Sequence, residues 1–248
     1  MARSLKKLIA AVFCLVLLFE LSSCAVNTKS AEQTGFSMGS LVGIKLYGKN
    51  SEALENANLL AEVVKTDERI SKNYEGSDIY RVNSSGEHGE TVSSKTYDEL
   101  RTVCDVYSES HGKAAVLSGA LTELWGFDTD EFRLPSEDEI LSAKEKCGDD
   151  KLIFDDGKKV YIPDGAKLNL GSAGKGIALD EAVKRIDEIN SQGGKITGAV
   201  ISVGGSDIRF TEKRQKLECR NTRPVQNGKR LFCGAVAYRC FYINLGRL

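Results

Sequence analysis

The chain has 248 residues, of which 41% are hydrophobic, so it can build a substantial core and is not expected to be disordered. Its formal net charge of -1 gives it no general attraction to nucleic acid, and we expect no nucleic-acid partner. An anionic ligand would have to be held by a local arrangement of residues.

The first 24 residues have the pattern of an export signal, in which basic residues precede an apolar run from Leu8 to Phe19. This run is shorter than the roughly 20 residues that span a bilayer. The following Leu21-Ser22-Ser23-Cys24 resembles a bacterial lipobox, in which the cysteine carries the lipid. We therefore expect residues 1–24 to be a lipoprotein signal peptide with Cys24 as the lipid attachment site, and residues 25–34 to be a polar tether. The protein would then be anchored to the cell membrane on its extracytoplasmic face; an uncleaved anchor and a plain secretory signal are the alternatives.

The first elements after the tether are a strand and two helices. Residues 36–47 alternate loosely and predict a single strand. Apolar residues at helical spacing from Ser51 to Val64 predict one amphipathic helix, with Ser51 as its cap. A second helical pattern covers residues 95–110.

The later part of the chain mixes both kinds of element. Pro135-Ser136-Glu137 predicts the start of a helix that ends near Cys147, and residues 152–162 predict a hairpin that turns at Asp156-Gly157. A strand is expected at 167–170, a helix at 175–190 and a buried strand at 199–203. Strands and helices do not alternate strictly, which favours an α+β fold over a doubly wound sheet.

The run from Asn169 to Gly176 lies between a predicted strand and a predicted helix and is rich in glycine. At such a junction the free N–H groups of the helix start favour an anion, and glycines allow a pyrophosphate to approach the backbone. Lys175 would add a positive charge. The spacing matches neither a Walker loop nor a Rossmann fingerprint, so an ordinary tight turn is the alternative.

Five short motifs, in the same order, resemble the FAD:protein FMN transferase (ApbE) family between Phe36 and Arg209. They are Met38-Gly39-Ser40, Tyr74 followed by Ser77-Asp78-Ile79-Tyr80-Arg81-Val82-Asn83, Leu124-Trp125-Gly126-Phe127, the run from Asn169 to Asp180, and Gly204-Gly205. The resemblance implies a flavin transferase domain at residues 35–210, with mixed, largely antiparallel sheets packed with helices.

The resemblance also implies an activity. Family enzymes cleave FAD, release AMP and move FMN onto a Ser or Thr hydroxyl of a target protein, here expected to be a redox subunit. Such a transfer uses Mg²⁺ to neutralise phosphate charge. By the motif match, Ser172 would offer a backbone oxygen to the metal, and Asn169 and Lys175 would touch the dinucleotide. Its pocket would be lined by Met38, Tyr74, Trp125, Gly126 and Phe127.

Each of these pocket residues also has a purely structural interpretation. Trp125 and Phe127 would be core residues, Tyr74 a surface tyrosine, and Met38 a filler of a gap in the core.

The chain departs from the family pattern at three places. Asn169 stands where the family usually has Asp, and residues 114–119 lack an acid and a hydroxyl that family chains commonly carry. Residues 211–248 contain nine Lys or Arg and two Glu but no Asp, Ser or His, whereas the preceding residues have a net charge of -8. We therefore expect 211–248 to be an atypical basic tail, produced by a frame change or truncation near Phe210, that lacks the family's metal ligands.

The departures leave two alternatives to flavin transfer. The chain would hydrolyse FAD to FMN and AMP if water replaced the acceptor hydroxyl. It would be a catalytically dead, FAD-binding remnant if the metal ligands were lost.

Overall fold

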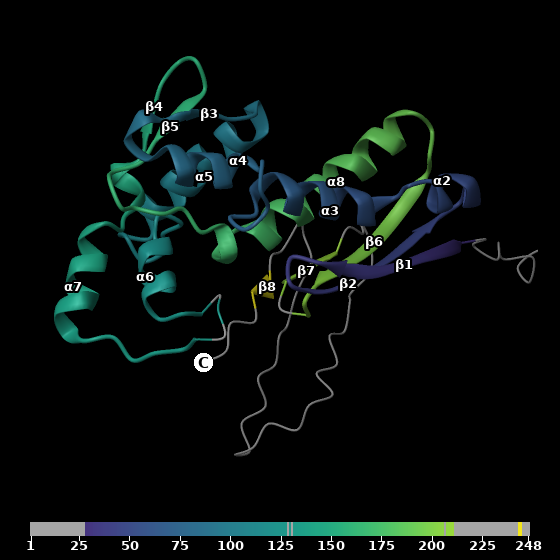
Figure 1. Cartoon of the computed structure of the whole chain (residues 1–248). Coiled ribbons are helices and arrows are strands. Elements are labelled where there is room, and N and C mark those ends of the chain that lie inside the picture. The colour runs from purple at the N-terminus through teal and green to yellow at the C-terminus, as the bar shows by residue number, and fades with distance from the viewer. Residues whose placement is uncertain (1–27, 128, 130, 206, 211–242, 245–248) are drawn as a thin grey trace, which may run out of the picture.

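The computed structural model describes residues 28–127, 129, 131–205, 207–210 and 243–244. Its elements form two groups that lie side by side (Figure 1). One group is a five-stranded sheet with helices along it, and the other is mainly helical with a small sheet. The expected α+β class is confirmed.

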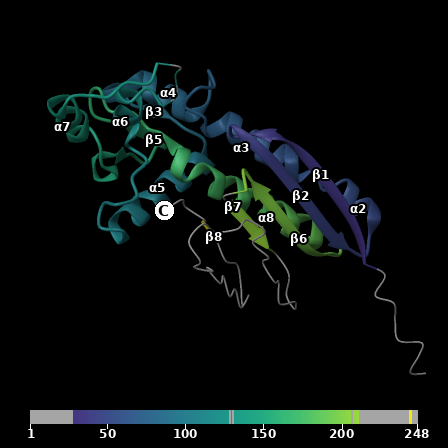
Figure 2. The same ribbon diagram turned by 90° about the horizontal axis from the view of Figure 1, so that it is seen from below.

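The larger sheet is antiparallel throughout and has the strand order β1-β2-β6-β7-β8. Three helices pack along it (Figure 2). Its strands are β1 (Lys29–Ser37), β2 (Ser40–Gly48), β6 (Ile196–Val203), β7 (Asp207–Phe210) and β8 (Ile243–Asn244), and its helices are α2 (Ser51–Glu55), α3 (Leu59–Ile70) and α8 (Gly174–Ser191). Alternate residues of β2 and β6 meet α3 and α8 in one apolar core, which includes Val42, Ile44, Leu46, Val63, Leu179 and Ile201.

The second group surrounds a separate apolar cluster that includes Ile79, Leu100, Leu117, Val160 and Leu168. It contains the antiparallel three-stranded sheet of order β3-β5-β4. Its elements are α4 (Asp78–Ser85), η1 (Gly86–His88), β3 (Glu90–Thr91), α5 (Ser94–Glu109), α6 (Gly119–Leu124), α7 (Glu137–Glu145), η2 (Asp149–Lys151), β4 (Ile153–Phe154) and β5 (Lys159–Tyr161), followed by η3 (Leu170–Ser172). Among the described residues, Met38 is the one that packs against both apolar clusters.

The strand expected at 36–47 is a hairpin, and this part of the prediction was wrong. β1 pairs with β2 in continuous register from Lys29 opposite Gly48 to Ser37 opposite Ser40. The loop is Met38-Gly39, with φ of 52° and 65°. The expected tether at 25–34 is also wrong from Lys29 onward, because the β1 backbone is paired with β2 there and Gln33 accepts a hydrogen bond from the Leu60 N–H at 3.1 Å.

The single helix expected from Ser51 to Val64 is broken into α2 and α3. Asn58 adopts the left-handed conformation with φ of 48°, which ends any continuous helix. The buried stripe of α3 is therefore Leu59, Val63, Thr66 and Ile70. Asn50, rather than Ser51, caps α2 through its side chain.

Most of the later elements are confirmed. The helices expected at 95–110, from Ser136 and at 175–190 are α5, α7 and α8, and Ser136 with Glu139 forms a capping box. The 152–162 hairpin exists, but Lys158 takes the positive φ of its turn, at 60°. Residues 167–170 do not form the expected strand. Their backbone groups bond to single residues and not to a neighbouring strand; for example, the Lys167 carbonyl accepts a hydrogen bond from the Gly119 N–H at 2.8 Å.

The expected signal peptide at 1–24, the lipid attachment site Cys24, and most of the basic tail at 211–248 lie outside the described residues. Within the described part of the chain, no helix is both long and apolar enough to cross a bilayer.

Candidate functional site

A hollow of about 360 Å³ lies where the two groups of elements meet. Its walls are formed by the β1-β2 loop, the end of α3 and the glycine-rich turn before α8. Its lining residues are Met38, Gly39, Asp67, Ile70, Ser71, Lys72, Asn73, Asn169, Leu170, Gly171, Gly174 and Lys175. The hollow thus brings Met38 together with Asn169 and Lys175, which lie far from Met38 in the sequence.

The glycine-rich turn is shaped by Asn169. Its Oδ1 accepts a hydrogen bond from the Gly171 N–H at 2.9 Å, and its Nδ2 donates to the Thr122 hydroxyl at 3.1 Å. The backbone N–H of Asn169 donates to the Val116 carbonyl at 2.8 Å. The side-chain amide of Asn169 therefore closes the turn on one side and joins it to α6 on the other.

The first turn of α8 carries no acidic residue, and its N–H groups donate to no capping side chain at the N-cap, Ala173. The N–H groups and the positive end of the helix dipole therefore make this end of α8 favourable for an anion. Gly174 is buried where α8 meets α3, and a Cβ there would lie 3.3 Å from Cδ1 of Ile70. A glycine thus allows the helix start to approach the opposite wall of the hollow.

Lys175 extends from α8 toward the end of β6. A Cβ built on Gly204 would lie 2.8 Å from the Lys175 Nζ and 3.0 Å from the Ser40 Oγ. Gly204 also has φ of 70° and donates its N–H to the Leu41 carbonyl at 2.8 Å. The Gly204 position therefore leaves room for the ammonium group beside the β1-β2 loop.

Asp67, which the sequence analysis missed, also lines the hollow. Its Oδ2 accepts hydrogen bonds from the Met38 N–H at 2.6 Å and from the Ser37 hydroxyl at 2.9 Å. The signal that points to it is its position in the last turn of α3, where the helix dipole disfavours a negative charge unless another group compensates.

The aromatic residues expected in the pocket are not among those that line the hollow. Tyr74 follows the lining residue Asn73 and is 51% exposed. Trp125 and Phe127 stack at the end of α6, with ring centroids 6.0 Å apart and planes 4° apart. Gly126 between them has φ of 69°. The Thr122–Asn169 bond connects α6 to the glycine-rich turn, and the assignment of these aromatic residues to the pocket stays a prediction.

Ser172, the expected metal ligand, is an exposed residue at the end of η3, next to the lining residue Gly171. Within the described residues there is no group of three or more His, Cys, Asp or Glu side chains that could hold a metal ion. The described residues therefore do not make a complete metal site by themselves.

A buried carboxylate, Asp149, holds the backbone segment to which Asn169 of the turn is bonded. Asp149 is 2% exposed and accepts hydrogen bonds from the backbone N–H groups of Val116, at 2.9 Å, and Leu117, at 2.7 Å. Burial raises the pKa of Asp149 above its usual range, although these two N–H groups act in the opposite direction. Asp149 thus orders the segment whose Val116 carbonyl holds Asn169.

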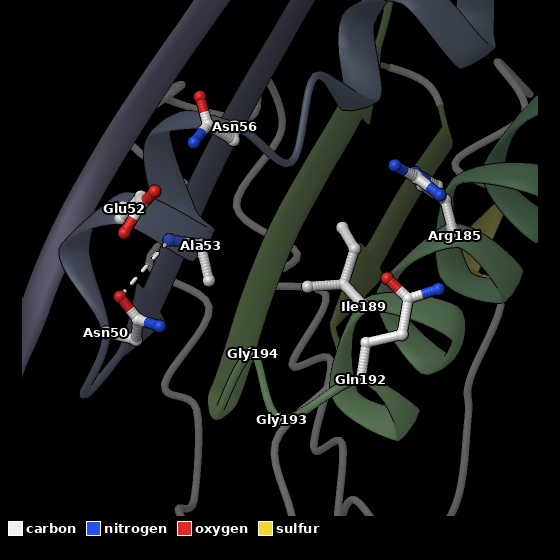
Figure 3. A pocket seen from close by; sticks show the side chains of 9 residues that line it. All are labelled: Asn50, Glu52, Ala53, Asn56, Arg185, Ile189, Gln192, Gly193 and Gly194. Carbon is white, nitrogen blue, oxygen red and sulfur yellow. Dashed lines mark hydrogen bonds between the residues drawn. The ribbon is translucent and has the colours of Figure 1, made fainter.

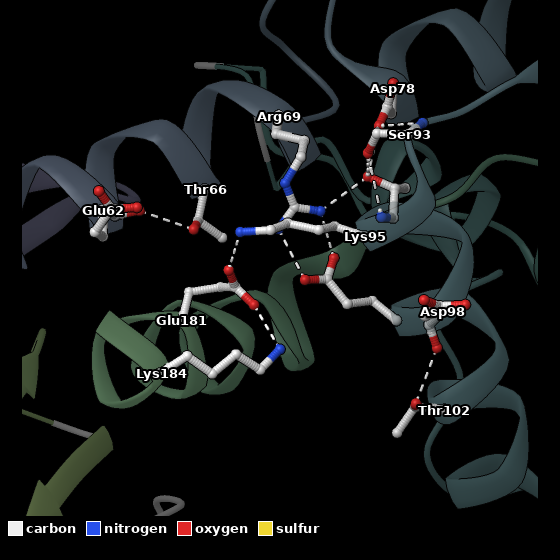
Figure 4. A network of polar contacts seen from close by, with 12 residues as sticks. Glu62, Thr66, Arg69, Asp78, Ser93, Lys95, Asp98, Thr102, Glu181 and Lys184 are labelled. Atoms are coloured by element: carbon white, nitrogen blue, oxygen red, sulfur yellow. Dashed lines mark hydrogen bonds and ion pairs between the residues drawn. The ribbon is translucent and has the colours of Figure 1, made fainter. Parts of the chain in front are cut away.

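Ion pairs tie the helices on both sides of the hollow to α5 (Figure 4). Arg69 of α3 forms two bonds to Glu99, at 2.5 and 2.8 Å, and its guanidinium also donates to Thr96 at 2.9 Å. Glu181 of α8, which is 5% exposed, pairs with Lys95 of α5 and, at 2.7 Å, with Lys184. One helix of the second group thereby fixes the two helices that carry Asp67 and Lys175.

A different hollow, of about 270 Å³, lies at the other end of α8 (Figure 3). Its lining residues are Asn50, Glu52, Ala53, Asn56, Arg185, Ile189, Gln192, Gly193 and Gly194. It contains none of the residues singled out from the sequence. The hollow at the glycine-rich turn is the candidate site, because it is lined by Met38, Asn169 and Lys175 together.

Comparison with known proteins identifies the family of the chain. The ApbE family profile matches residues 38–227, which reaches past the boundary expected near Phe210. The FAD:protein FMN transferase of Haemophilus influenzae is 22% identical, over 91% of this chain and 68% of that protein.

Solved structures show the same fold. The ApbE protein from Thermotoga maritima superimposes with a TM-score of 0.65 and 25% identity, over 74% of this chain and 59% of that one. The apo form of Pseudomonas stutzeri flavinyl transferase ApbE gives a TM-score of 0.64 and 22% identity, over 75% of this chain and 59% of that one. The chain thus spans about three fifths of these proteins. The profile match covers most of the chain and includes the β1-β2 loop, α3 and the glycine-rich turn, and on this basis the protein belongs to the ApbE family.

Proposed function

We propose that this protein binds FAD at the turn before α8 and transfers FMN from it to a Ser or Thr hydroxyl of a target protein, releasing AMP. The observation that carries the proposal is the meeting of Asn169, Lys175 and the uncapped start of α8 in one hollow. The relative in Haemophilus influenzae is named for this reaction.

The chain's own residues have distinct roles in this proposal. The N–H groups at the start of α8 and the Lys175 ammonium attract the diphosphate, because both place positive charge beside the turn. Asn169 keeps the turn in the conformation that exposes these donors. Met38, Ile70 and Leu170 add apolar surface for a flat ring of the dinucleotide.

Transfer of FMN breaks the pyrophosphate bond between the two phosphates of FAD. The acceptor oxygen forms a bond to the FMN phosphorus, its proton is lost, and AMP leaves. Positive charge beside the phosphates stabilises this step, since negative charge spreads over the phosphate oxygens as the bond breaks.

Mg²⁺ belongs to the proposal as the ion that would neutralise phosphate charge, since it prefers oxygen ligands and shares them with phosphates. Around the turn, the described residues offer the Asp67 carboxylate and the Ser172 backbone oxygen, which are of the right chemical type but too few for a site.

The test is a reaction of the full chain with FAD, with and without Mg²⁺ and with and without a purified redox-complex subunit that presents an exposed Ser or Thr. We expect AMP and an acceptor whose mass has increased by FMN. Lys175→Ala should lower both products, whereas Lys49→Ala, at the far end of β2, should not. AMP formed equally without the acceptor would identify a hydrolase. Quenching of flavin fluorescence without AMP would identify an FAD-binding remnant.

We also propose that the protein is a lipoprotein held at the extracytoplasmic face of the membrane through Cys24. The support is the lipobox-like Leu21-Ser22-Ser23-Cys24 after an apolar run. Labelled palmitate should be incorporated into the protein in bacterial cells and not into Cys24→Ala. Equal labelling of the two proteins would refute the anchor.

A further inference from the structure

The β1-β2 loop has a backbone that its sequence does not favour. Both loop residues have positive φ, 52° at Met38 and 65° at Gly39, as a type I′ hairpin turn requires. Asn, Asp or Gly normally occupies the first position, since a larger side chain is strained there. Met38 therefore needs an external interaction to hold this conformation.

Asp67 supplies that interaction. Its Oδ2 accepts the Met38 N–H at 2.6 Å and the Ser37 hydroxyl at 2.9 Å, so one carboxylate oxygen holds two consecutive residues at the hairpin tip. Hydrogen bonds to a charged acceptor are stronger than those between neutral groups. Ser37 is buried, which limits access of water to this contact.

The same residue also orders a second wall of the hollow. The Asp67 backbone carbonyl accepts the Ser71 N–H at 2.8 Å at the C-terminal end of α3, where the segment with Ser71, Lys72 and Asn73 begins. Asp67 thus connects the hairpin tip to this segment, and residues of both line the hollow.

We propose that Asp67 is a positioning residue for the dinucleotide site, holding Met38 in its left-handed conformation so that the hairpin tip forms one side of the pocket. The inference rests on the proposed function, because it assigns the pocket to FAD. Asp67 is not required to touch the ligand.

The experiment compares three variants of the full chain. Asp67→Ala removes both hydrogen bonds to the hairpin tip. Asp67→Asn keeps an oxygen that can accept both. Glu68→Ala removes a neighbouring exposed carboxylate of α3 and serves as the control. Hydrogen–deuterium exchange at Met38, thermal unfolding and FAD titration by flavin fluorescence are measured for each.

We expect faster exchange at Met38 and about tenfold weaker FAD binding in Asp67→Ala, the size of effect expected when a hydrogen bond to a charged group is lost. Asp67→Asn should recover most of the protection from exchange at Met38 and most of the FAD affinity. Glu68→Ala should match the wild type in both measurements. If Asp67→Ala is too unstable to fold, Asp67→Asn decides, because a positioning role predicts near-normal affinity. Affinity as weak in Asp67→Asn as in Asp67→Ala would show instead that the charge itself contacts the ligand.

Unchanged exchange at Met38 in Asp67→Ala, or faster exchange with unchanged affinity, would overturn the positioning role while leaving FAD binding in place. Failure of the wild-type chain to bind FAD would instead remove the proposed function, and the inference with it. The exchange measurement distinguishes these cases, since it needs no ligand.

Discussion

The side-chain amide of Asn83 pairs with the main chain of Leu168 as a neighbouring strand would. Its Nδ2 donates to the Leu168 carbonyl at 2.9 Å, and its Oδ1 accepts the Leu168 N–H at 2.7 Å. Leu168 is fully buried and immediately precedes the Asn169 turn. A residue of α4 thus replaces the missing strand partner of the segment that leads into the candidate site.

Replacing Asn83 with Ala should therefore reduce both stability and FAD affinity. Two buried backbone groups of Leu168 would lose their partners, which costs about 2–4 kcal/mol. Chemical denaturation gives the free energy of unfolding, and fluorescence titration gives the affinity. Ser84→Ala, which removes an exposed bond within the same helix, should change stability by no more than about 0.5 kcal/mol. Equal effects of the two substitutions would contradict this role for Asn83.

Gly204 and Gly205 form a matched pair for testing the placement of Lys175. Both have positive φ, 70° and 69°, but a Cβ on Gly204 meets Lys175 and Ser40, whereas a Cβ on Gly205 has nothing within 4 Å. Each change to Ala should cost about 1–2 kcal/mol through backbone strain. Only Gly204→Ala should also weaken FAD binding, by displacing the ammonium group, and titration of both variants gives the comparison.

The bidentate pair between Arg69 and Glu99 should be sensitive even to a conservative change. Its side chains are only 17% and 14% exposed, and Lys cannot form the two parallel bonds of a guanidinium. We expect Arg69→Lys to reduce the free energy of unfolding by about 1–2 kcal/mol. Arg133→Lys changes an exposed pair with Glu139 and should cost less than about 0.5 kcal/mol. A similar shift in the unfolding midpoint of both variants would argue against a structural role for the α3–α5 pair.

Glu181 should make the protein sensitive to acid. Burial acts to raise its pKa, but the hydrogen-bonded ammonium groups of Lys184 and Lys95 outweigh burial and hold the pKa below the ordinary value of 4.5. Because the folded-state pKa is lowered, this stabilisation is present above pH 4.5 and is lost as the pH falls through the lowered pKa.

Glu181→Gln should accordingly be less stable than the wild type at neutral pH and should lose less stability on acidification. Unfolding midpoints measured from pH 7 to pH 3 test this expectation, because this pH range includes the ordinary pKa of Glu. Glu188→Gln, in the more exposed pair with Arg185, is the control and should follow the wild-type profile. Parallel profiles for Glu181→Gln and the wild type would show that the ion pairs do not stabilise the fold.

Features that depend on local sequence could be predicted. The glycine-rich turn and α8 follow from residues adjacent in the chain, and Ser136 with Glu139 carries the start signal of α7 in a four-residue pattern. The mixed fold class and the order of most elements followed in the same way.

Features that depend on distant contacts could not be predicted. Met38-Gly39 lacks the usual hairpin signature, and its conformation is held by Asp67, 29 positions away in the chain. The break at Asn58 interrupts an apolar pattern that continues past it, so periodicity alone predicts one helix. The segment 167–170 resembles a strand by composition, but its partner is the side chain of Asn83.

The packing of Met38 against both apolar clusters has a consequence for how the molecule melts. If either cluster came apart alone, it would uncover this thioether and the apolar surface of the other cluster that it contacts. Two cores that share a residue in this way are expected to lose their structure in one cooperative event rather than in succession. Ligand seated beside Met38 would accordingly raise the melting temperature of the sheet and of the helical group together.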